Sequence, residues 1–204
     1  EFRRVLFRSR CLDQCQLALV HQREHFPAAE ALVPFREEIG KRPPLASLEL
    51  LWTAHRGPHL LVSGFVHPPT EARAWQALQL AGETEVLTIK GLEGGVDLPI
   101  SRACVTGRPS ASGEGRLILH PRDHGCYAPD PPWRDIDSWG EQALAALGGQ
   151  GELATALHWN GGTYLWQAGQ CPDQSSGLAR CRELLNSGAV LAHLQRMHRF
   201  CAET

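Results

Sequence analysis

The chain has 204 residues, of which 43% are hydrophobic and 21% charged, as in an ordinary globular protein with one sizeable core. Its formal net charge of −2 gives no overall positive charge to attract nucleic acid or anionic lipid. No apolar run approaches the roughly 18 residues of a membrane helix. Seven irregularly spaced cysteines without a C-x-x-C pair argue against a disulfide framework or a zinc ribbon and favour reduced thiols in the cytoplasm.

The first nine residues have an unusual origin. Residues 1–9 (EFRRVLFRS) resemble, codon for codon, the translation of a common short-read sequencing adapter. The alternative is a natural basic arm that contacts acidic surfaces. We exclude this segment from the fold interpretation, as one excludes residues left over from an expression vector. An adapter joined in frame marks the end of a DNA fragment, so we predict that the natural protein extends upstream. Residues 10–204 would then be an incomplete C-terminal α/β domain.

The first third of the chain predicts helices separated by prolines and glycines. Residues 12–20 fit a short helix that runs into a strand. Residues 28–39 carry apolar side chains at helical spacing, between a proline that favours the start of a helix and a glycine that favours its end. A Pro-Pro corner then precedes residues 45–52, which predict a short apolar helix.

The middle of the chain predicts a strand–helix–strand unit. We expect a buried strand at 59–66, a helix at 71–81 with Thr70 as its N-cap, and a second strand at 85–90. Such a unit within about thirty residues implies parallel strands joined by a right-handed crossover. The expected fold class is therefore α/β, with a partial parallel sheet flanked by helices.

The remainder predicts a hairpin followed by helices. Two short strands, 101–106 and 116–120, are joined by a polar loop, and a loop rich in proline and aspartate follows them. From residue 135 onward, glycine breaks divide a helical pattern. The four expected helices span residues 137–147, 151–167, 173–186 and 188–201.

The most informative segment is the glycine-rich loop after the second strand, residues 88–99 (TIKGLEGGVDLP). Three glycines in five positions let the backbone approach a neighbour closely or adopt positive φ, and the loop carries the acids Glu93 and Asp97. A strand followed by such a loop is how α/β enzymes present groups to a ligand at the carboxyl edge of a sheet. A surface turn with solvated acids is the alternative.

Other candidate chemistry is weaker. Three His-x-x-x-His pairs occur, but prolines interrupt two of them and none is H-E-x-x-H, so we interpret these as structural or surface histidines. The sequence contains no G-x-S-x-G, Walker or G-x-G-x-x-G motif. Lys41 and Arg42 precede a rigid proline corner, where an arginine can receive a carboxylate or simply complement the end of a helix dipole.

A series of short motifs lies in a distinctive order between about residues 17 and 201. A helix ends in IGKRPP, the first strand ends in GFVHP, and the second strand ends in KGLEGGVD. PRDHG follows the hairpin, and WNGG and SGAV lie in the helical region. This order resembles the C-terminal α/β part of the anthranilate phosphoribosyltransferases of glycosyltransferase family 3, and most closely the divergent cyanobacterial-type members.

The resemblance implies a fold, an activity and a set of site residues. The fold would be the C-terminal portion of a phosphoribosyltransferase or nucleoside phosphorylase-like catalytic domain. The family transfers a phosphoribosyl group from phosphoribosyl pyrophosphate to the amine of anthranilate in tryptophan biosynthesis, uses Mg2+ and forms homodimers. By this resemblance Arg42 contacts the substrate carboxylate, Glu93 and Asp97 hold the metal, and Lys90, Gly91 and Gly94 are further candidates in the loop.

Two departures from the family pattern set limits on this interpretation. Asp97 is followed by Leu98 instead of the family's glutamate, and Lys90 replaces a histidine. The family's glycine-rich pyrophosphate loop also lies upstream of the part that this chain matches. We therefore assign no catalytic residue and predict that the 204-residue chain alone is inactive. The alternative function is a divergent, non-catalytic family member that binds nucleic acid or a sugar phosphate.

Overall fold

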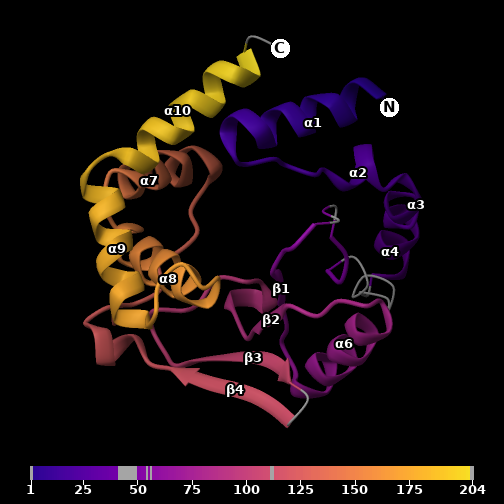
Figure 1. Cartoon of the computed structure of the whole chain (residues 1–204), viewed down its shortest axis with the longest axis horizontal. Coiled ribbons are helices and arrows are strands. Elements are labelled where there is room, and N and C mark those ends of the chain that lie inside the picture. Colours follow the sequence, from indigo (N-terminus) through magenta and orange to yellow (C-terminus); the bar gives the residue numbers. More distant parts are fainter. Residues whose placement is uncertain (1, 41–49, 54, 56, 111–112, 203–204) are drawn as a thin grey trace. The chain divides into compact units, whose positions relative to one another are not determined.

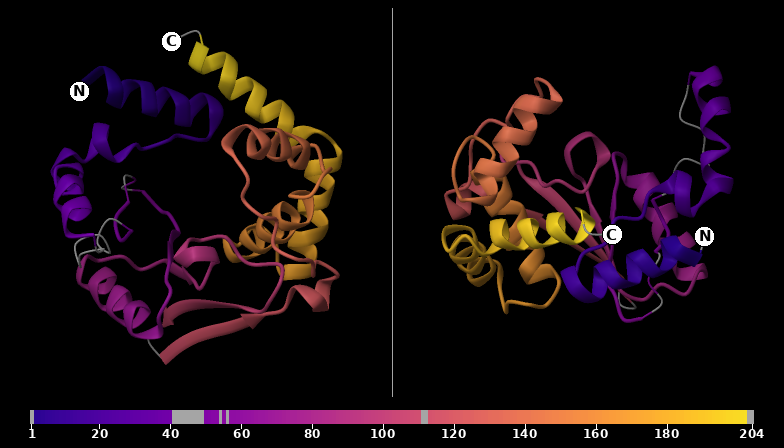
Figure 2. Two further views of the ribbon diagram at one scale, coloured as in Figure 1. Left: turned by 180° about the vertical axis from the view of Figure 1, so that it is seen from behind. Right: turned by 90° about the horizontal axis from the view of Figure 1, so that it is seen from above.

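The structure is a computed structural model that describes residues 2–40, 50–53, 55, 57–110 and 113–202 (Figures 1 and 2). The chain divides into two compact units. One unit comprises Glu1–Ala54 with Ala192–Thr204, and the other comprises His55–Leu191. Within the described ranges, no helix combines the length and the apolar character needed to cross a bilayer.

The first unit is helical. Its elements are α1 (Phe2–Cys15), α2 (Gln22–His25), α3 (Pro27–Glu30), α4 (Val33–Ile39) and most of α10 (Ala189–Ala202). Buried Cys11 and Cys15 pack with Phe200. The first turns of α1 fall within the segment that we set aside.

Two expectations for this unit were wrong. The helix expected at 28–39 is divided into α3 and α4, because Pro34 has no N–H for a helical bond and its ring excludes the carbonyl four residues earlier. No strand forms at 16–20, where Gln16 has a φ of 54° and ends the helix. The helix expected at 45–52 lies mainly outside the described residues.

The second unit contains a four-stranded mixed sheet in the order β1-β2-β3-β4. β1 (Leu61–Gly64) is parallel to β2 (Val86–Ile89), as predicted. β3 (Cys104–Ser110) is antiparallel both to β2 and to β4 (Gly113–Leu119). The predicted strand–helix–strand unit and the hairpin are thus confirmed, although β3 and β4 extend into the segment that was expected to be a polar loop. The hairpin extends the parallel pair into a mixed sheet.

The crossover helix α6 (Pro68–Leu80) begins earlier than expected. His67 is its N-cap, and Pro68 and Pro69 occupy the first turn, where the fixed φ of proline suits a helix and its missing N–H costs nothing. The predicted N-cap role of Thr70 was therefore wrong, because Thr70 already lies inside the helix.

All four residues of β2 are buried, and they alternate between two helical layers. Leu87 and Ile89 belong to a core that includes Trp159 of α8 (Ala154–Gln167) and Leu178 of α9 (Gln174–Asn186). Thr88 instead contacts α6. The helices α7 (Ile136–Leu147), α8, α9 and α10 confirm the four predicted near the C-terminus, and α8 starts three residues late because Gly151 turns the chain at a φ of 85°.

The helices α8 and α9 approach each other very closely, as the side-by-side ribbons of Figure 1 show. A Cβ added to Gly162 would lie 2.6 Å from the Cα of Leu178, and one added to Gly177 would lie 2.2 Å from the carbonyl oxygen of Gly162. Two glycines therefore allow a backbone-to-backbone contact that any side chain would separate.

Candidate functional site

The glycine-rich loop leaves the sheet at Lys90 and folds back on itself. The Lys90 amide still donates to Val105 of β3, at 2.9 Å, while its side chain is exposed. A single 3-10 turn, η1 (Leu92–Gly94), follows. The Gly95 amide donates to the Leu92 carbonyl at 2.7 Å, and the Leu92 amide donates to the Asp97 carbonyl at 2.9 Å. The backbone of this loop is therefore closed by its own hydrogen bonds.

Close packing explains the glycines of this loop. A Cβ on Gly91 would lie 2.3 Å from the Gly95 carbonyl oxygen, and one on Gly94, which has a φ of 76°, would lie 2.6 Å from Val66. Across the contact, a Cβ on Gly64 of β1 would lie 2.2 Å from the Gly94 carbonyl oxygen. The loop thus packs against the end of β1 with no room for side chains on either surface.

The two acids of the loop are exposed. Glu93 adopts φ 50° and ψ 24°, a left-handed conformation that is uncommon outside glycine, asparagine and aspartate. In the described part of the chain, no group of three His, Cys, Asp or Glu side chains is arranged to hold a metal. Mg2+ usually binds through one or two carboxylates together with substrate phosphates and water, so the donor chemistry of Glu93 and Asp97 fits this ion. Their role as metal ligands stays a prediction.

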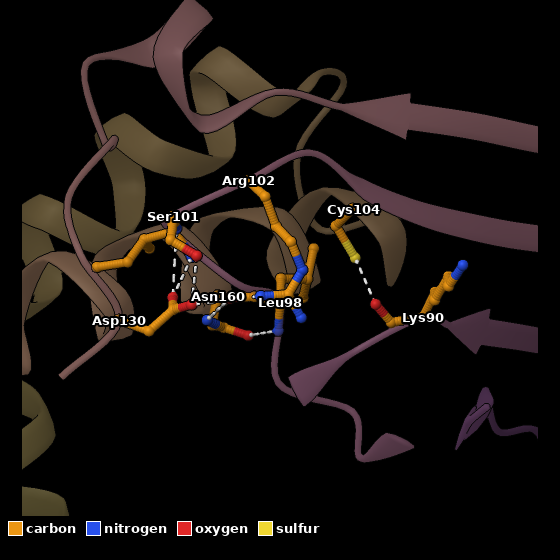
Figure 3. Close-up of polar contacts among 8 residues, drawn as sticks. Lys90, Leu98, Ser101, Arg102, Cys104, Asp130 and Asn160 are labelled. Atoms are coloured by element: carbon orange, nitrogen blue, oxygen red, sulfur yellow. Dashed lines mark hydrogen bonds and ion pairs between the residues drawn. The ribbon is translucent and has the colours of Figure 1, made fainter. Parts of the chain in front are cut away.

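Asn160 of α8 holds the end of the loop (Figure 3). Its side-chain oxygen accepts from the Leu98 amide at 2.7 Å, and its Nδ2 donates to the Leu98 carbonyl at 3.0 Å. The same Nδ2 donates to Ala156 of its own helix at 2.9 Å. One side chain therefore satisfies both backbone groups of the residue after Asp97.

Asp130 holds the next segment in the same way (Figure 3). Its Oδ1 accepts from the amides of Ile100, at 2.9 Å, and Ser101, at 3.2 Å, while its Oδ2 accepts from the Ser101 hydroxyl. Arg102 lies 3.5 Å from the same carboxylate. Our sequence interpretation gave Asp130 no role, although its place in a proline-rich stretch was a signal that a fixed loop passes there.

An apolar cavity of about 510 Å3 adjoins the loop and is bounded by α7, α8 and the segment 130–133. Asp97, Asp130, Asn160 and Gln142 supply its polar groups. Its apolar lining includes Leu98, Trp133, Trp139, Ala146, Leu153 and Leu157. A mostly apolar cavity with a few polar groups at one side is typical of a small-molecule site.

Tyr164 connects α8 to the loop. Its hydroxyl donates to the carbonyl oxygen of Val96. Burial raises the pKa of Tyr164 well above its usual range, and the nearby carboxylate of Asp97 raises it further. The phenol therefore stays protonated at neutral pH and acts as a hydrogen-bond donor that fixes the loop.

Arg42, the predicted contact for a substrate carboxylate, lies outside the described residues. Of the other candidates, Lys90, Gly91, Glu93, Gly94 and Asp97 all lie in one loop at the carboxyl end of β2. Their roles stay predictions, and the structure adds Asn160, Asp130 and Tyr164 as groups that position this loop and the segment after it.

Comparison with known proteins gives a consistent result. No family model matches the chain. The anthranilate phosphoribosyltransferase of Verminephrobacter eiseniae is 28% identical over 194 residues, which cover 93% of this chain and 56% of that protein. The chain is similar to anthranilate phosphoribosyltransferases. Another relative of the same name, from Paracidovorax citrulli, is 26% identical over 193 residues.

The fold of the anthranilate phosphoribosyltransferase from Thermus thermophilus also matches, with a TM-score of 0.74 and 23% identity. The match covers 95% of this chain and 58% of that structure. The resemblance and the α/β fold class predicted from the sequence are therefore confirmed. The chain spans little more than half the length of the anthranilate phosphoribosyltransferases that it matches.

Proposed function

We propose that the chain is part of an enzyme that transfers a phosphoribosyl group from phosphoribosyl pyrophosphate to an aromatic amine of the anthranilate type, in tryptophan biosynthesis. The observation that carries this proposal is the acid-bearing loop at the carboxyl end of β2, fixed by Asn160 beside an apolar cavity, in a chain similar to anthranilate phosphoribosyltransferases.

Glu93 and Asp97 are the proposed metal-binding groups. Bound Mg2+ would neutralise charge on the pyrophosphate leaving group. The protein's own part is positioning, because Asn160 and Tyr164 fix the backbone on both sides of Asp97 before any ligand arrives. A fixed carboxylate loses little conformational entropy on binding, which favours affinity.

The apolar cavity beside Asp97 is the proposed place for the aromatic ring of the acceptor. Its volume and its tryptophans, Trp133 and Trp139, suit a planar ring. Because Asp97 also lines the cavity, a ring bound there would lie next to the proposed metal-binding loop. Arg42 is proposed to contact the acceptor's carboxylate. We further propose a homodimeric, cytoplasmic parent protein, of which the 204-residue chain alone is inactive.

The decisive experiment measures binding of phosphoribosyl pyrophosphate to the complete gene product, with and without Mg2+, by calorimetry. We expect Mg2+-dependent binding that Asp97→Asn and Glu93→Gln each weaken about tenfold. The control is Asp123→Asn, which removes an exposed carboxylate outside the loop. Anthranilate should also quench tryptophan fluorescence, and Trp139→Leu should reduce that quenching.

Two results would overturn the proposal. One is an absence of Mg2+-dependent binding of phosphoribosyl pyrophosphate. The other is tight binding of single-stranded nucleic acid that Asp97→Asn leaves unchanged, which would support the divergent, non-catalytic alternative.

A further inference from the structure

A second, smaller cavity lies between the start of α8 and the end of α9 and contains no residue of the glycine-rich loop. Its volume is about 230 Å3. This is nearly eight times the roughly 30 Å3 that a water molecule occupies in the liquid, so a phosphate group with a small organic group attached fits. Thr155 and His158 line it from α8, and Arg182 and Asn186 line it from α9.

Arg182 is an exposed cation at this cavity. The structure gives it no ion pair among the described residues, and Glu183, the next residue of α9, is already paired with Arg180 at 2.5 Å. The planar guanidinium fork matches two oxygens of a phosphate, and its charge here is not matched by a protein carboxylate.

His158 is held in place by a hydrogen bond to α9. Its Nε2 lies 2.8 Å from the Leu178 carbonyl, which can only accept, so Nε2 carries the hydrogen. Its Nδ1 lies 3.7 Å from the Cys126 sulfur. Burial lowers the pKa of His158, the hydrogen bond to the Leu178 carbonyl raises it in part, and the positive charge of Arg182 lowers it again. An anion beside Arg182 would cancel the effect of that charge, so the ring reports on what binds there.

The remaining polar groups of the cavity favour an anion over a cation. None of the residues that line it is acidic, and the Thr155 hydroxyl and the Asn186 amide can both donate hydrogen bonds. The N-cap of α8 is Leu153, which offers no side-chain cap, and the first turn of this helix contains no acidic residue.

We propose that this cavity binds a small phosphate-bearing molecule, with the Arg182 guanidinium as its main contact and Thr155 and Asn186 as hydrogen-bond donors. This site uses no residue of the glycine-rich loop and needs no metal. It is therefore independent of the transferase function proposed above.

The test is a titration of the 204-residue chain with inorganic phosphate and then with ribose 5-phosphate, in the absence of Mg2+, followed by NMR of the His158 ring protons. We expect a saturable shift and a rise in the pKa of His158 on binding. Arg182→Gln should weaken binding about 10- to 100-fold, because a charge-assisted contact is lost. Arg180→Gln, on the same helix but outside the cavity, should leave binding unchanged.

Three results would overturn this proposal. The first is that neither ligand shifts the His158 signals. The second is that Arg182→Gln and Arg180→Gln bind phosphate equally well, with thermal melting showing both variants folded. The third is that a short single-stranded DNA competes with phosphate at Arg182 and binds far more tightly than ribose 5-phosphate, which would make this a nucleic-acid surface instead.

Discussion

Two glutamates near β2 have opposite surroundings. Glu71 of α6 is fully buried, accepts a hydrogen bond from the Thr88 hydroxyl at 2.6 Å, and pairs with Arg116 of β4 at 2.8 Å. Trp75 donates to the same threonine at 3.2 Å, and the Arg116 guanidinium lies 5.1 Å from the Trp75 ring. Glu93, on the glycine-rich loop, is exposed.

This comparison separates a structural carboxylate from one available to a ligand. A buried charge is tolerated only when it is paired and hydrogen-bonded, and Glu71 has both kinds of partner. Gly107 leaves room for the buried carboxylate, because a Cβ at that position would lie 2.6 Å from Glu71 Oε1. Glu93 and Asp97 are instead exposed, on a backbone that the protein holds fixed, as the metal-binding role proposed for them requires.

The largest expected effect is at the buried pair. Arg116→Ala leaves the Glu71 carboxylate buried without its cation, so the free energy of unfolding should fall by about 3 kcal/mol in urea titrations. The matched control is Arg180→Ala, which breaks the exposed Arg180–Glu183 pair and should cost less than about 1 kcal/mol. Equal losses would show that the network around Glu71 is not a special source of stability.

The contact between β1 and the loop gives the next effect. Gly64→Ala places a methyl group against the carbonyls of Gly94 and Gly95, so we expect a loss of about 2 kcal/mol of unfolding free energy. Gly140→Ala, in α7, meets no atom within 4 Å and should raise stability by about 0.5 to 1 kcal/mol. A neutral Gly64→Ala would mean that the loop does not pack on β1 as described.

The hydrogen bonds between Asn160 and Leu98 should give a smaller effect on stability, but one that can be measured at a single residue. Asn160→Ala leaves both backbone groups of Leu98 without their partner, which should cost about 1 to 2 kcal/mol. Hydrogen exchange at the Leu98 amide should also become faster. Gln79→Ala, on the exposed side of α6, should change neither quantity. Unaltered Leu98 exchange in Asn160→Ala would contradict the anchoring role.

The smallest effect is on pH dependence. The Gly57 carbonyl, which accepts from His59 Nδ1 at 2.7 Å, raises the pKa of His59, and Glu83 at 2.8 Å raises it further. A raised pKa in the folded state means stabilisation that is complete at low pH and lost as the pH rises through that pKa. The difference in melting temperature between wild type and His59→Gln should therefore be larger at about pH 5.5 than at about pH 8.5. A melting-temperature difference that grows as the pH rises would contradict the raised pKa of His59.

The sequence predicted local structure well and long-range contacts poorly. The spacing of apolar residues and the positions of glycine and proline predicted the strand–helix–strand unit, the hairpin and the C-terminal helices, because these depend on neighbouring residues. Asn160 contacts Leu98 from 62 positions away, and no local pattern carries such a pairing. Burial of Glu71, the first residue of the helix expected at 71–81, could not be predicted either, since the sequence does not distinguish an exposed acid in a first helical turn from a buried one.

The loop itself shows both outcomes. Its position after β2 was predicted from a short apolar run followed by glycines. That its glycines allow a close backbone approach was also predicted. The partner in that approach was not, because Gly64 lies about 30 positions before Gly94 and Gly95 in the sequence. The departures from the family pattern at Lys90 and Leu98 fall at the ends of this same loop.

The close contact of α8 with α9 has a mechanical consequence. Because the glycine surfaces interlock backbone to backbone, the two helices cannot slide separately, and Asn160 attaches this rigid pair to the residue that follows Asp97. Any displacement of the pair should therefore move Leu98 with it or break the hydrogen bonds that Asn160 makes to Leu98. The position of the Asp97 carboxylate thus depends on the orientation of α8 and α9, two helices that extend beyond the candidate site.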